Sequence, residues 1–122
     1  MFIQNIKEEA KNNTNFRKVI YTGKNSQLVL MSLLKGEDIG METHPTTDQI
    51  ICIVEGDGKA ILNGEEKNFS KHNIVFVPAG TEHNFINTGG ENLKLYTIYA
   101  PPAHKDGTIH ATKEDAQKEE KY

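Results

Sequence analysis

Short apolar runs, separated by turn residues, fill the middle of this chain. They cover residues 19–21, 28–34, 49–55, 59–62, 74–77, 83–87 and 93–100. Gly, Asn, Asp and Pro lie between the runs, and turn signals at intervals of about eight to twelve residues are typical of a sandwich or a barrel. No stretch between residues 19 and 100 repeats its apolar positions at helical spacing. We therefore predict an all-β fold of about eight short strands.

Two of the turns look like hairpin connections. Asn63-Gly64 directly follows the run 59–62, and Asn-Gly between two strands is the strongest short-range hairpin signal. Gly56-Asp57-Gly58 follows the run 49–55 and resembles a two-residue hairpin loop. We predict a hairpin at each of these two points.

The alternation of side chains along a strand assigns residues to the inside or the outside of such a fold. In the run 49–54 it places Gln49, Ile51 and Ile53 inside and Ile50, Cys52 and Val54 outside. Tyr96 and Tyr99 fall on opposite faces of the last run, so at most one can line the interior. We expect the core to be formed around Ile51, Ile53, Phe76 and Phe85.

The two ends of the chain are polar. A short helix is plausible at residues 6–11, and Lys113–Lys121 predicts a second, solvated helix with Thr112 as its N-cap and Asp115 completing a weak capping box. We expect this last helix to be a frayed tail that contacts little. The predicted organisation is a single domain over residues 1–122, with a barrel core at about 19–100 and a C-terminal extension at 101–122.

Composition narrows the function classes. The 122 residues carry a net charge of -3 and one arginine, Arg17, without any basic stripe, which argues against nucleic-acid binding. The longest apolar run, residues 28–34, is too short to span a bilayer, and acidic residues stand where a signal peptide would have basic ones. We expect a cytoplasmic protein with neither nucleic acid nor membrane as a partner. Cys52 is the only cysteine, and we interpret it as a small buried apolar residue.

Four polar residues stand where chemistry could occur. Glu42 and His44 are two apart, so on a strand both side chains leave the same face, as an ion pair or as two metal ligands. Gln49 heads an otherwise apolar inner face and needs a partner, because burying an unpaired amide costs about 1–3 kcal/mol. His83 begins a strand just past the turn Pro78-Ala79-Gly80.

These residues resemble the two motifs of the cupin superfamily. The first motif, G-x5-H-x-H-x3-4-E-x6-G, can be anchored on Gly56, which places Gln49 at the glutamate, His44 at the second histidine and Glu42 at the first. The second motif, G-x5-P-x-G-x2-H-x3-N, matches from Pro78 through His83 to Asn87. His72 replaces its opening glycine, where we expect the neighbouring Asn73 to take up the left-handed backbone.

The resemblance implies a single cupin barrel, a jelly roll or double-stranded β-helix. It also implies a divalent metal inside the barrel, bound by Glu42, His44, Gln49 and His83 in place of three histidines and one glutamate. The net ligand charge is unchanged at minus one, so a functioning site is plausible. Fe, Mn, Ni and Zn all suit such ligands. The alternative is a barrel that has lost its metal, with a Glu42–His44 ion pair and Gln49 as a hydrogen-bonded core amide.

Two functions are compatible with this resemblance. The first is an enzyme acting on a small oxygen-rich molecule, as a dioxygenase or a sugar isomerase or epimerase, with Glu42, His44 and His83 as catalytic residues. The second is a non-catalytic module that binds or senses a small molecule. His104 and His110 could fold over the barrel mouth and contact a ligand, although a surface crossover is the simpler interpretation.

The resemblance also implies a homodimer. The apolar side chains predicted to point outward at residues 50, 52 and 54 must be covered by the terminal segments or by another chain. The first eighteen residues offer few apolar side chains for this, namely Phe2, Ile3, Ile6 and Phe16.

Overall fold

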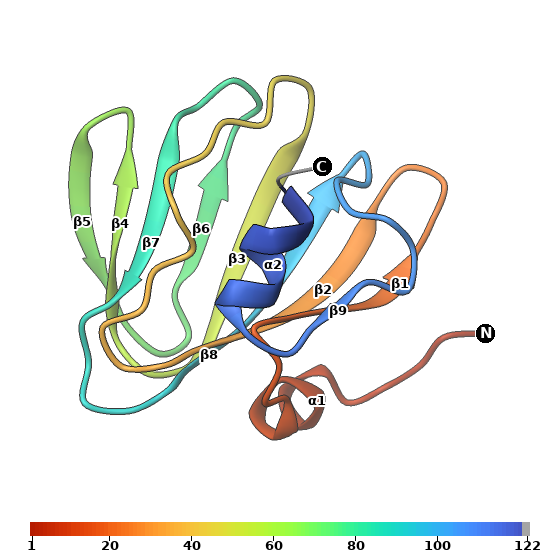
Figure 1. Ribbon diagram of the computed structural model, residues 1–122, viewed down its shortest axis with the longest axis horizontal. Coiled ribbons are helices and arrows are strands. Elements are labelled where there is room, and N and C mark those ends of the chain that lie inside the picture. The colour runs from red at the N-terminus through yellow and green to blue at the C-terminus, as the bar shows by residue number, and fades with distance from the viewer. Residues whose placement is uncertain (121–122) are drawn as a thin grey trace.

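Two antiparallel sheets form the framework of the computed structural model, which describes residues 1–120. The strands are β1 Arg17–Thr22, β2 Gln27–Leu33, β3 Asp48–Glu55, β4 Gly58–Leu62, β5 Glu65–Phe69, β6 Ile74–Val77, β7 His83–Asn87, β8 Leu93–Ala100 and β9 Ile109–His110. The helices are α1 Ile6–Asn12 and α2 Lys113–Glu120. The larger sheet has the order β6-β3-β8-β2-β1-β9 and the smaller one β5-β4-β7, and together they give the barrel seen in Figure 1. The predicted all-β fold is confirmed.

Each predicted apolar run lies in a strand, and one turn has the predicted form. β4 and β5 pair in antiparallel register across Asn63-Gly64. Both turn residues have positive φ, at 47° and 83°, as the Asn-Gly type I′ turn requires. The two-residue strand β9 was not predicted, because Ile109–His110 is too short to show an alternation. It pairs with Arg17 and Lys18 at the start of β1.

The predicted hairpin at Gly56-Asp57-Gly58 is wrong. β3 pairs with β6 and β8 in the larger sheet, whereas β4 pairs with β5 and β7 in the smaller one. The chain therefore passes from one sheet to the other at this point. Gly58 serves close packing, since a Cβ there would lie 2.4 Å from the Ile86 carbonyl oxygen and 2.4 Å from the Phe69 ring. The opening of the second motif also differs, because His72 itself, at φ 74°, takes up the left-handed backbone.

The core lies between the sheets and follows the predicted alternation along β3. Gln49, Ile51 and Ile53 are all buried on the inner face, and Phe85 and Tyr99 are buried without exposed surface. Phe76 is a correction, because its side chain is 54% exposed while its neighbour Val77 is buried. Every residue of β6 is apolar, so the sequence pattern does not tell which face points inward.

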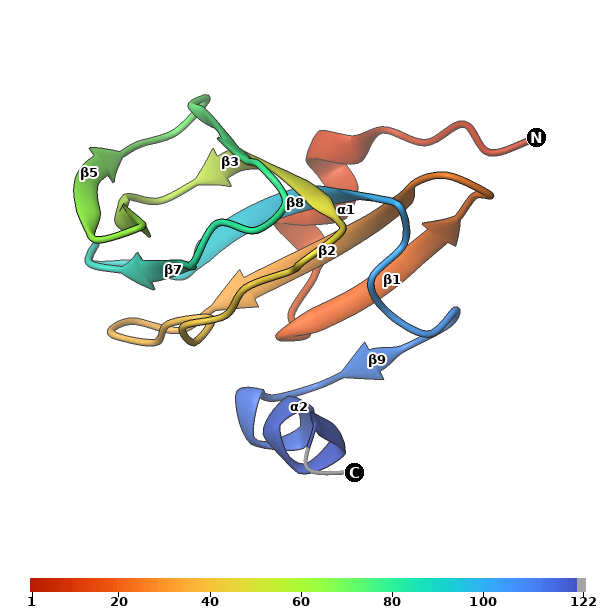
Figure 2. The ribbon, with the colours of Figure 1, turned by 90° about the horizontal axis from the view of Figure 1, so that it is seen from above.

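The two helices cover opposite faces of the larger sheet, as Figure 2 shows. On the outer face, α1 buries Ala10 against Leu30 and Val54. On the inner face, α2 buries Ala116 within the main core cluster. The predicted N-cap of α2 is confirmed, since Thr112 Oγ1 accepts a hydrogen bond from the Asp115 N–H at 3.1 Å.

The prediction that α2 is a frayed tail is wrong. Lys113 contacts the Asp38 carboxylate, and Glu119 Oε2 lies 2.5 Å from His110 Nε2. These two contacts fix both ends of the helix over the inner face of the sheet. Neither described helix has the length and apolar character needed to cross a membrane.

Candidate metal centre

A pair of backbone hydrogen bonds brings together two of the predicted site residues, Glu42 and His83. Glu42 lies in the irregular segment between β2 and β3, and His83 is the first residue of β7. The Glu42 N–H donates to the His83 carbonyl at 3.0 Å, and the His83 N–H donates to the Glu42 carbonyl at 2.9 Å. Residues 42–44 form no strand beyond this one bridge, yet His44 still lies beside Glu42.

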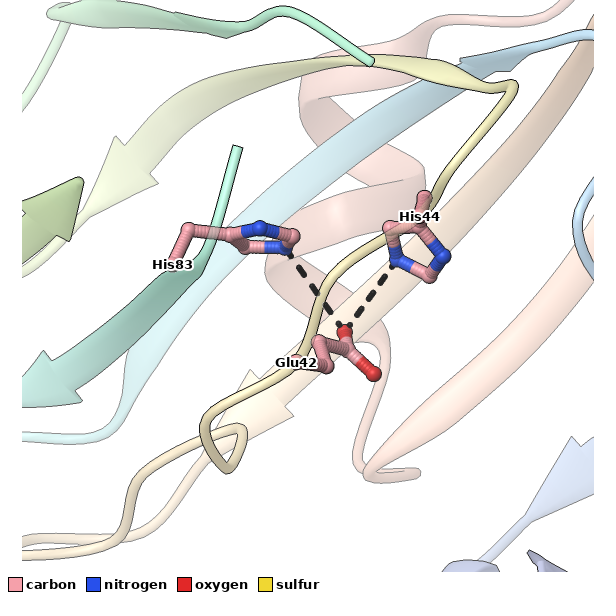
Figure 3. A group of neighbouring side chains, drawn as sticks. All are labelled: Glu42, His44 and His83. Carbon is pink, nitrogen blue, oxygen red and sulfur yellow. Dashed lines mark ion pairs between the residues drawn. The ribbon is translucent and has the colours of Figure 1, made fainter. Parts of the chain in front are cut away.

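Glu42 lies between the two histidines, as Figure 3 shows. Its Oε1 is 3.4 Å from His44 Nε2 and 3.9 Å from His83 Nε2. The three donor atoms all lie within 4.8 Å of one another. Ligands that each stand about 2.0–2.2 Å from one ion are at most about 4.4 Å apart, so a small adjustment of these side chains would bring all three atoms onto one ion. The His83 side chain is almost fully buried and the other two are partly buried.

A neighbouring carbonyl orients the His83 ring. His83 Nδ1 lies 2.8 Å from the Thr81 carbonyl oxygen, which can only accept a hydrogen bond. Nδ1 is therefore the nitrogen that donates to this carbonyl, and Nε2 is the nitrogen that faces Glu42 and is placed to bind a metal. This is the usual arrangement of a metal-ligating histidine, in which the second nitrogen donates to a carbonyl or a carboxylate.

Gln49 is held by hydroxyl groups from β8. Its Nε2 donates to Thr97 Oγ1 and to the Tyr99 hydroxyl, each at 3.2 Å. The side chain is buried, and its other polar atom, Oε1, has no hydrogen-bond partner in the part of the chain described. The sequence predicted that this amide would need a partner, and among the described residues only its nitrogen has one.

The donor set fits a divalent cation. Glu42 Oε1, His44 Nε2, His83 Nε2 and Gln49 Oε1 are all buried atoms without a hydrogen-bond partner among the described residues. Glu42 Oε1 lies at ion-pair distance from both imidazole nitrogens, whereas an unpaired buried atom such as Gln49 Oε1 costs about 1–3 kcal/mol. One bound cation would pair all four atoms. Two imidazole nitrogens, one carboxylate and one amide oxygen suit iron, manganese, nickel or zinc.

The charges around the centre favour an ionised Glu42. Burial alone would raise the pKa of its carboxyl group, but His44, Arg17 and His83 together hold that pKa below its ordinary value. Arg17 was not among the predicted site residues. It is the first residue of β1, is only 2% exposed, and its charge reaches Glu42.

The two histidines after β8 have different positions. The His104 ring packs edge-on against Tyr99, with the ring centroids 4.9 Å apart, and Tyr99 also contacts the His44 ring at 5.6 Å. His110 instead contacts Arg17 at 3.3 Å and Glu119. His104 is thus next to the site, whereas His110 helps to hold α2. Of Tyr96 and Tyr99, Tyr99 is the one that points inward.

The comparisons with known proteins identify the family of this chain. The model of the cupin domain family matches residues 29–99, which include all four predicted ligands. The chain belongs to the cupin family. The uncharacterized protein YrkC of Bacillus subtilis (strain 168) is 49% identical to this cupin over 94% of the chain. The uncharacterized protein L612 of Acanthamoeba polyphaga mimivirus is 44% identical over 89% of it.

The cupin spans 65% of the length of YrkC and 71% of that of L612. The crystal structure of BH2720 from Bacillus halodurans superimposes on this cupin with a TM-score of 0.95 at 42% sequence identity. The match covers 96% of this chain and 93% of BH2720. The likeness to this solved structure therefore extends over nearly the whole chain.

Proposed function

We propose that this cupin binds one divalent metal ion through Glu42, His44, Gln49 and His83 and acts on a small oxygen-rich molecule there. The observation that carries the proposal is the set of four buried donor atoms that have no hydrogen-bond partner among the described residues. The bound metal would act as a Lewis acid or a redox centre for an oxygen of the substrate. Iron, manganese, nickel and zinc all remain compatible with these ligands.

Each protein residue has a definite part in this proposal. Glu42 is ionised at neutral pH, because its pKa lies below the ordinary value, and it supplies the negative charge of the site. His83 presents Nε2, since the Thr81 carbonyl holds Nδ1. Gln49 presents Oε1, since its nitrogen donates to Thr97 and Tyr99. Glu42, His44 and His83 are the proposed catalytic residues, with Glu42 as the proposed proton acceptor.

We propose that the protein is an enzyme, either a dioxygenase or a sugar isomerase or epimerase. A divalent metal ion at this site would support either kind of reaction. The cupin fold hosts many activities and does not choose between them. A binding or sensing module would use the same residues without turnover. We also propose that the protein works in the cytoplasm as a homodimer, with a small molecule as its only other partner.

Metal analysis of protein purified without an affinity tag tests the site. We expect about one equivalent of a transition metal in the wild type and almost none in His83→Ala. His72→Asn is the matched control, since His72 is an exposed histidine in a left-handed position that asparagine tolerates. Equal metal content in His83→Ala and the wild type would refute the proposed site. Oxygen-uptake and isomerisation assays on the metal-loaded protein then separate an enzyme from a binding module.

A further inference from the structure

A further buried nitrogen near the metal centre, on His104, lies outside both cupin motifs. The Nε2 atom of His104 is buried and, like the four proposed donor atoms, has no hydrogen-bond partner among residues 1–119. His104 does not belong to the group whose donor atoms all lie within 4.8 Å of one another. It therefore stands beside the proposed ligands at a greater distance.

Tyr99 connects His104 to the centre. The His104 and His44 rings both pack edge-on against the Tyr99 ring, at interplanar angles of 83° and 82°. The Tyr99 hydroxyl accepts the hydrogen bond from Gln49. Two proposed ligands and His104 thus share contact with one buried side chain, and the charges of Glu42 and His44 both act on the His104 imidazole.

A buried glutamine fixes the backbone at His104. Gln27 Oε1 accepts hydrogen bonds from the N–H groups of Ala103 and His104, at 3.2 and 3.0 Å. Gln27 Nε2 donates to the His104 carbonyl at 2.7 Å and to Thr22 Oγ1 at 3.0 Å. The side chain of Gln27 is only 2% exposed. All the hydrogen-bonding capacity of this amide is used, and most of it holds one residue of the crossover in place.

The surroundings of His104 favour a neutral imidazole. Burial lowers the pKa of His104 to about 4, and the charge of Arg17 acts in the same direction. A cavity of about 200 Å³ adjoins His104, and its lining includes Arg17, Lys105, His110 and Glu119 but none of the four proposed ligands. A neutral imidazole can offer one N–H to an oxygen without adding a further positive charge.

We propose that His104 contacts the molecule bound at the metal centre and holds one of its carboxylate oxygens through Nε2. The inference rests on the proposed metal site, but it concerns ligand binding and leaves the metal ligands unchanged. The same placement would suit a hydroxyl oxygen, since imidazole Nε2 can either donate or accept.

Acetate binding to the cobalt(II)-loaded protein tests this inference, followed by the visible absorption of the metal. His104→Phe keeps a ring against Tyr99 and removes both nitrogens. We expect its cobalt affinity to match the wild type and its acetate affinity to fall at least about tenfold, the effect of losing one hydrogen bond to a charged group. His104→Gln should recover part of the loss, because an amide nitrogen can reach the position of Nε2. His72→Asn should bind acetate as the wild type does.

The possible failures are distinguishable. A wild type that binds no cobalt would refute the metal site, and the role of His104 with it. Cobalt bound normally with unchanged acetate affinity in both His104→Phe and His104→Gln would overturn the role of His104 alone. Loss of cobalt from folded His104→Phe, checked by circular dichroism, would make His104 a metal ligand and would also overturn the inference.

Discussion

Glu42 is the only carboxylate among the four proposed ligands. Its position between two imidazoles places one negative charge next to both of them. The Glu42 oxygen is 3.4 Å from His44 and 3.9 Å from His83. An amide at position 49 is compatible with this arrangement, because its nitrogen can donate to Thr97 and Tyr99 while its oxygen remains available. Relative to the usual cupin set, the carboxylate stands at position 42 and an amide at position 49. All four side chains still offer a donor atom to a metal.

Removing either histidine should release the metal and leave the barrel folded. In His44→Ala and His83→Ala the imidazole donor is lost, whereas the apolar core around Ile51, Ile53 and Phe85 remains. We expect less than about a tenth of the wild-type metal content, measured by elemental analysis, together with an unchanged far-UV circular dichroism spectrum. Loss of metal accompanied by unfolding would show instead that the metal has a structural role.

The two atoms of the Gln49 amide can be tested separately. Gln49→Glu keeps an oxygen ligand and adds a negative charge, so we expect metal binding to be retained or strengthened. Gln49→Leu removes the oxygen and leaves the hydroxyls of Thr97 and Tyr99 without this donor, so we expect at least about tenfold weaker binding. Calorimetric titration with zinc or cobalt measures both. Equal affinity of Gln49→Leu and the wild type would remove Gln49 from the ligand set.

At the scale of elements, the docking of α2 should depend on pH. The hydrogen bond from Lys113 is the largest cause that lowers the pKa of Asp38, and the hydrogen bond from His110 lowers that of Glu119. Because both values are lowered in the folded protein, the stabilisation is complete above the ordinary values of 3.8 and 4.5. It is lost as the pH falls through the lowered values.

We therefore expect α2 to detach in acid before the barrel unfolds. Ala116 lies in α2 and is buried where this helix packs against the core. Its methyl resonance should move toward the random-coil position as the pH falls below about 4. The methyl resonances of Val29 and Leu95, in the centre of the sheet, should not move with it. Glu119→Gln should show a weaker pH dependence. Simultaneous movement of all these resonances would mean that α2 and the barrel unfold together.

The crossover after β8 gives a second test at this scale. Gln27→Met keeps the volume of the side chain but removes the hydrogen bonds that hold Ala103 and His104. We expect acetate affinity to fall as in His104→Phe, while metal affinity stays at the wild-type level. An unchanged acetate affinity would show that the crossover keeps its position without Gln27.

Local sequence patterns predicted those features of this fold that depend on neighbours in the sequence. The runs of β-strand residues, the Asn63-Gly64 turn and the cap at Thr112 are of this kind, and all are confirmed. The passage between sheets at Gly58 was missed because the glycine is required by Phe69 and Ile86, which are distant in the sequence.

The same distinction applies to the site. The resemblance to the cupin motifs predicts that Glu42, His44 and His83 belong to one site, and the structure places their donor atoms together. His104 could not be assigned in this way, because its position depends on Gln27, 77 residues earlier. Such a contact leaves no local pattern. The burial of α2 was missed for a similar reason, since its sequence is almost entirely polar and only Ala116 contacts the core.

At the scale of the whole molecule, an apolar row crosses the outer face of the larger sheet. Cross-strand pairing places its members side by side in the order Phe76, Ile50, Ile98, Leu28 and Tyr21. The two ends of the row are about half exposed. α1 covers the neighbouring positions Leu30 and Val54, so the N-terminal segment covers only part of the apolar surface predicted for this face.

We propose that this row is the contact of a homodimer. A twofold pair would bury the row against its own copy, and a stable interface of ordinary size buries about 1,600 Å² in total. Light scattering at micromolar concentration should then give a mass of about twice 13.7 kDa. Phe76→Lys should shift the protein toward the monomer, because the dimer would bury the charged lysine against the apolar side chains of the partner. Leu34→Lys, at an exposed leucine outside the row, should leave the mass unchanged. A wild-type mass near 13.7 kDa would mean that the chain covers this face by itself and that the proposed dimer is wrong.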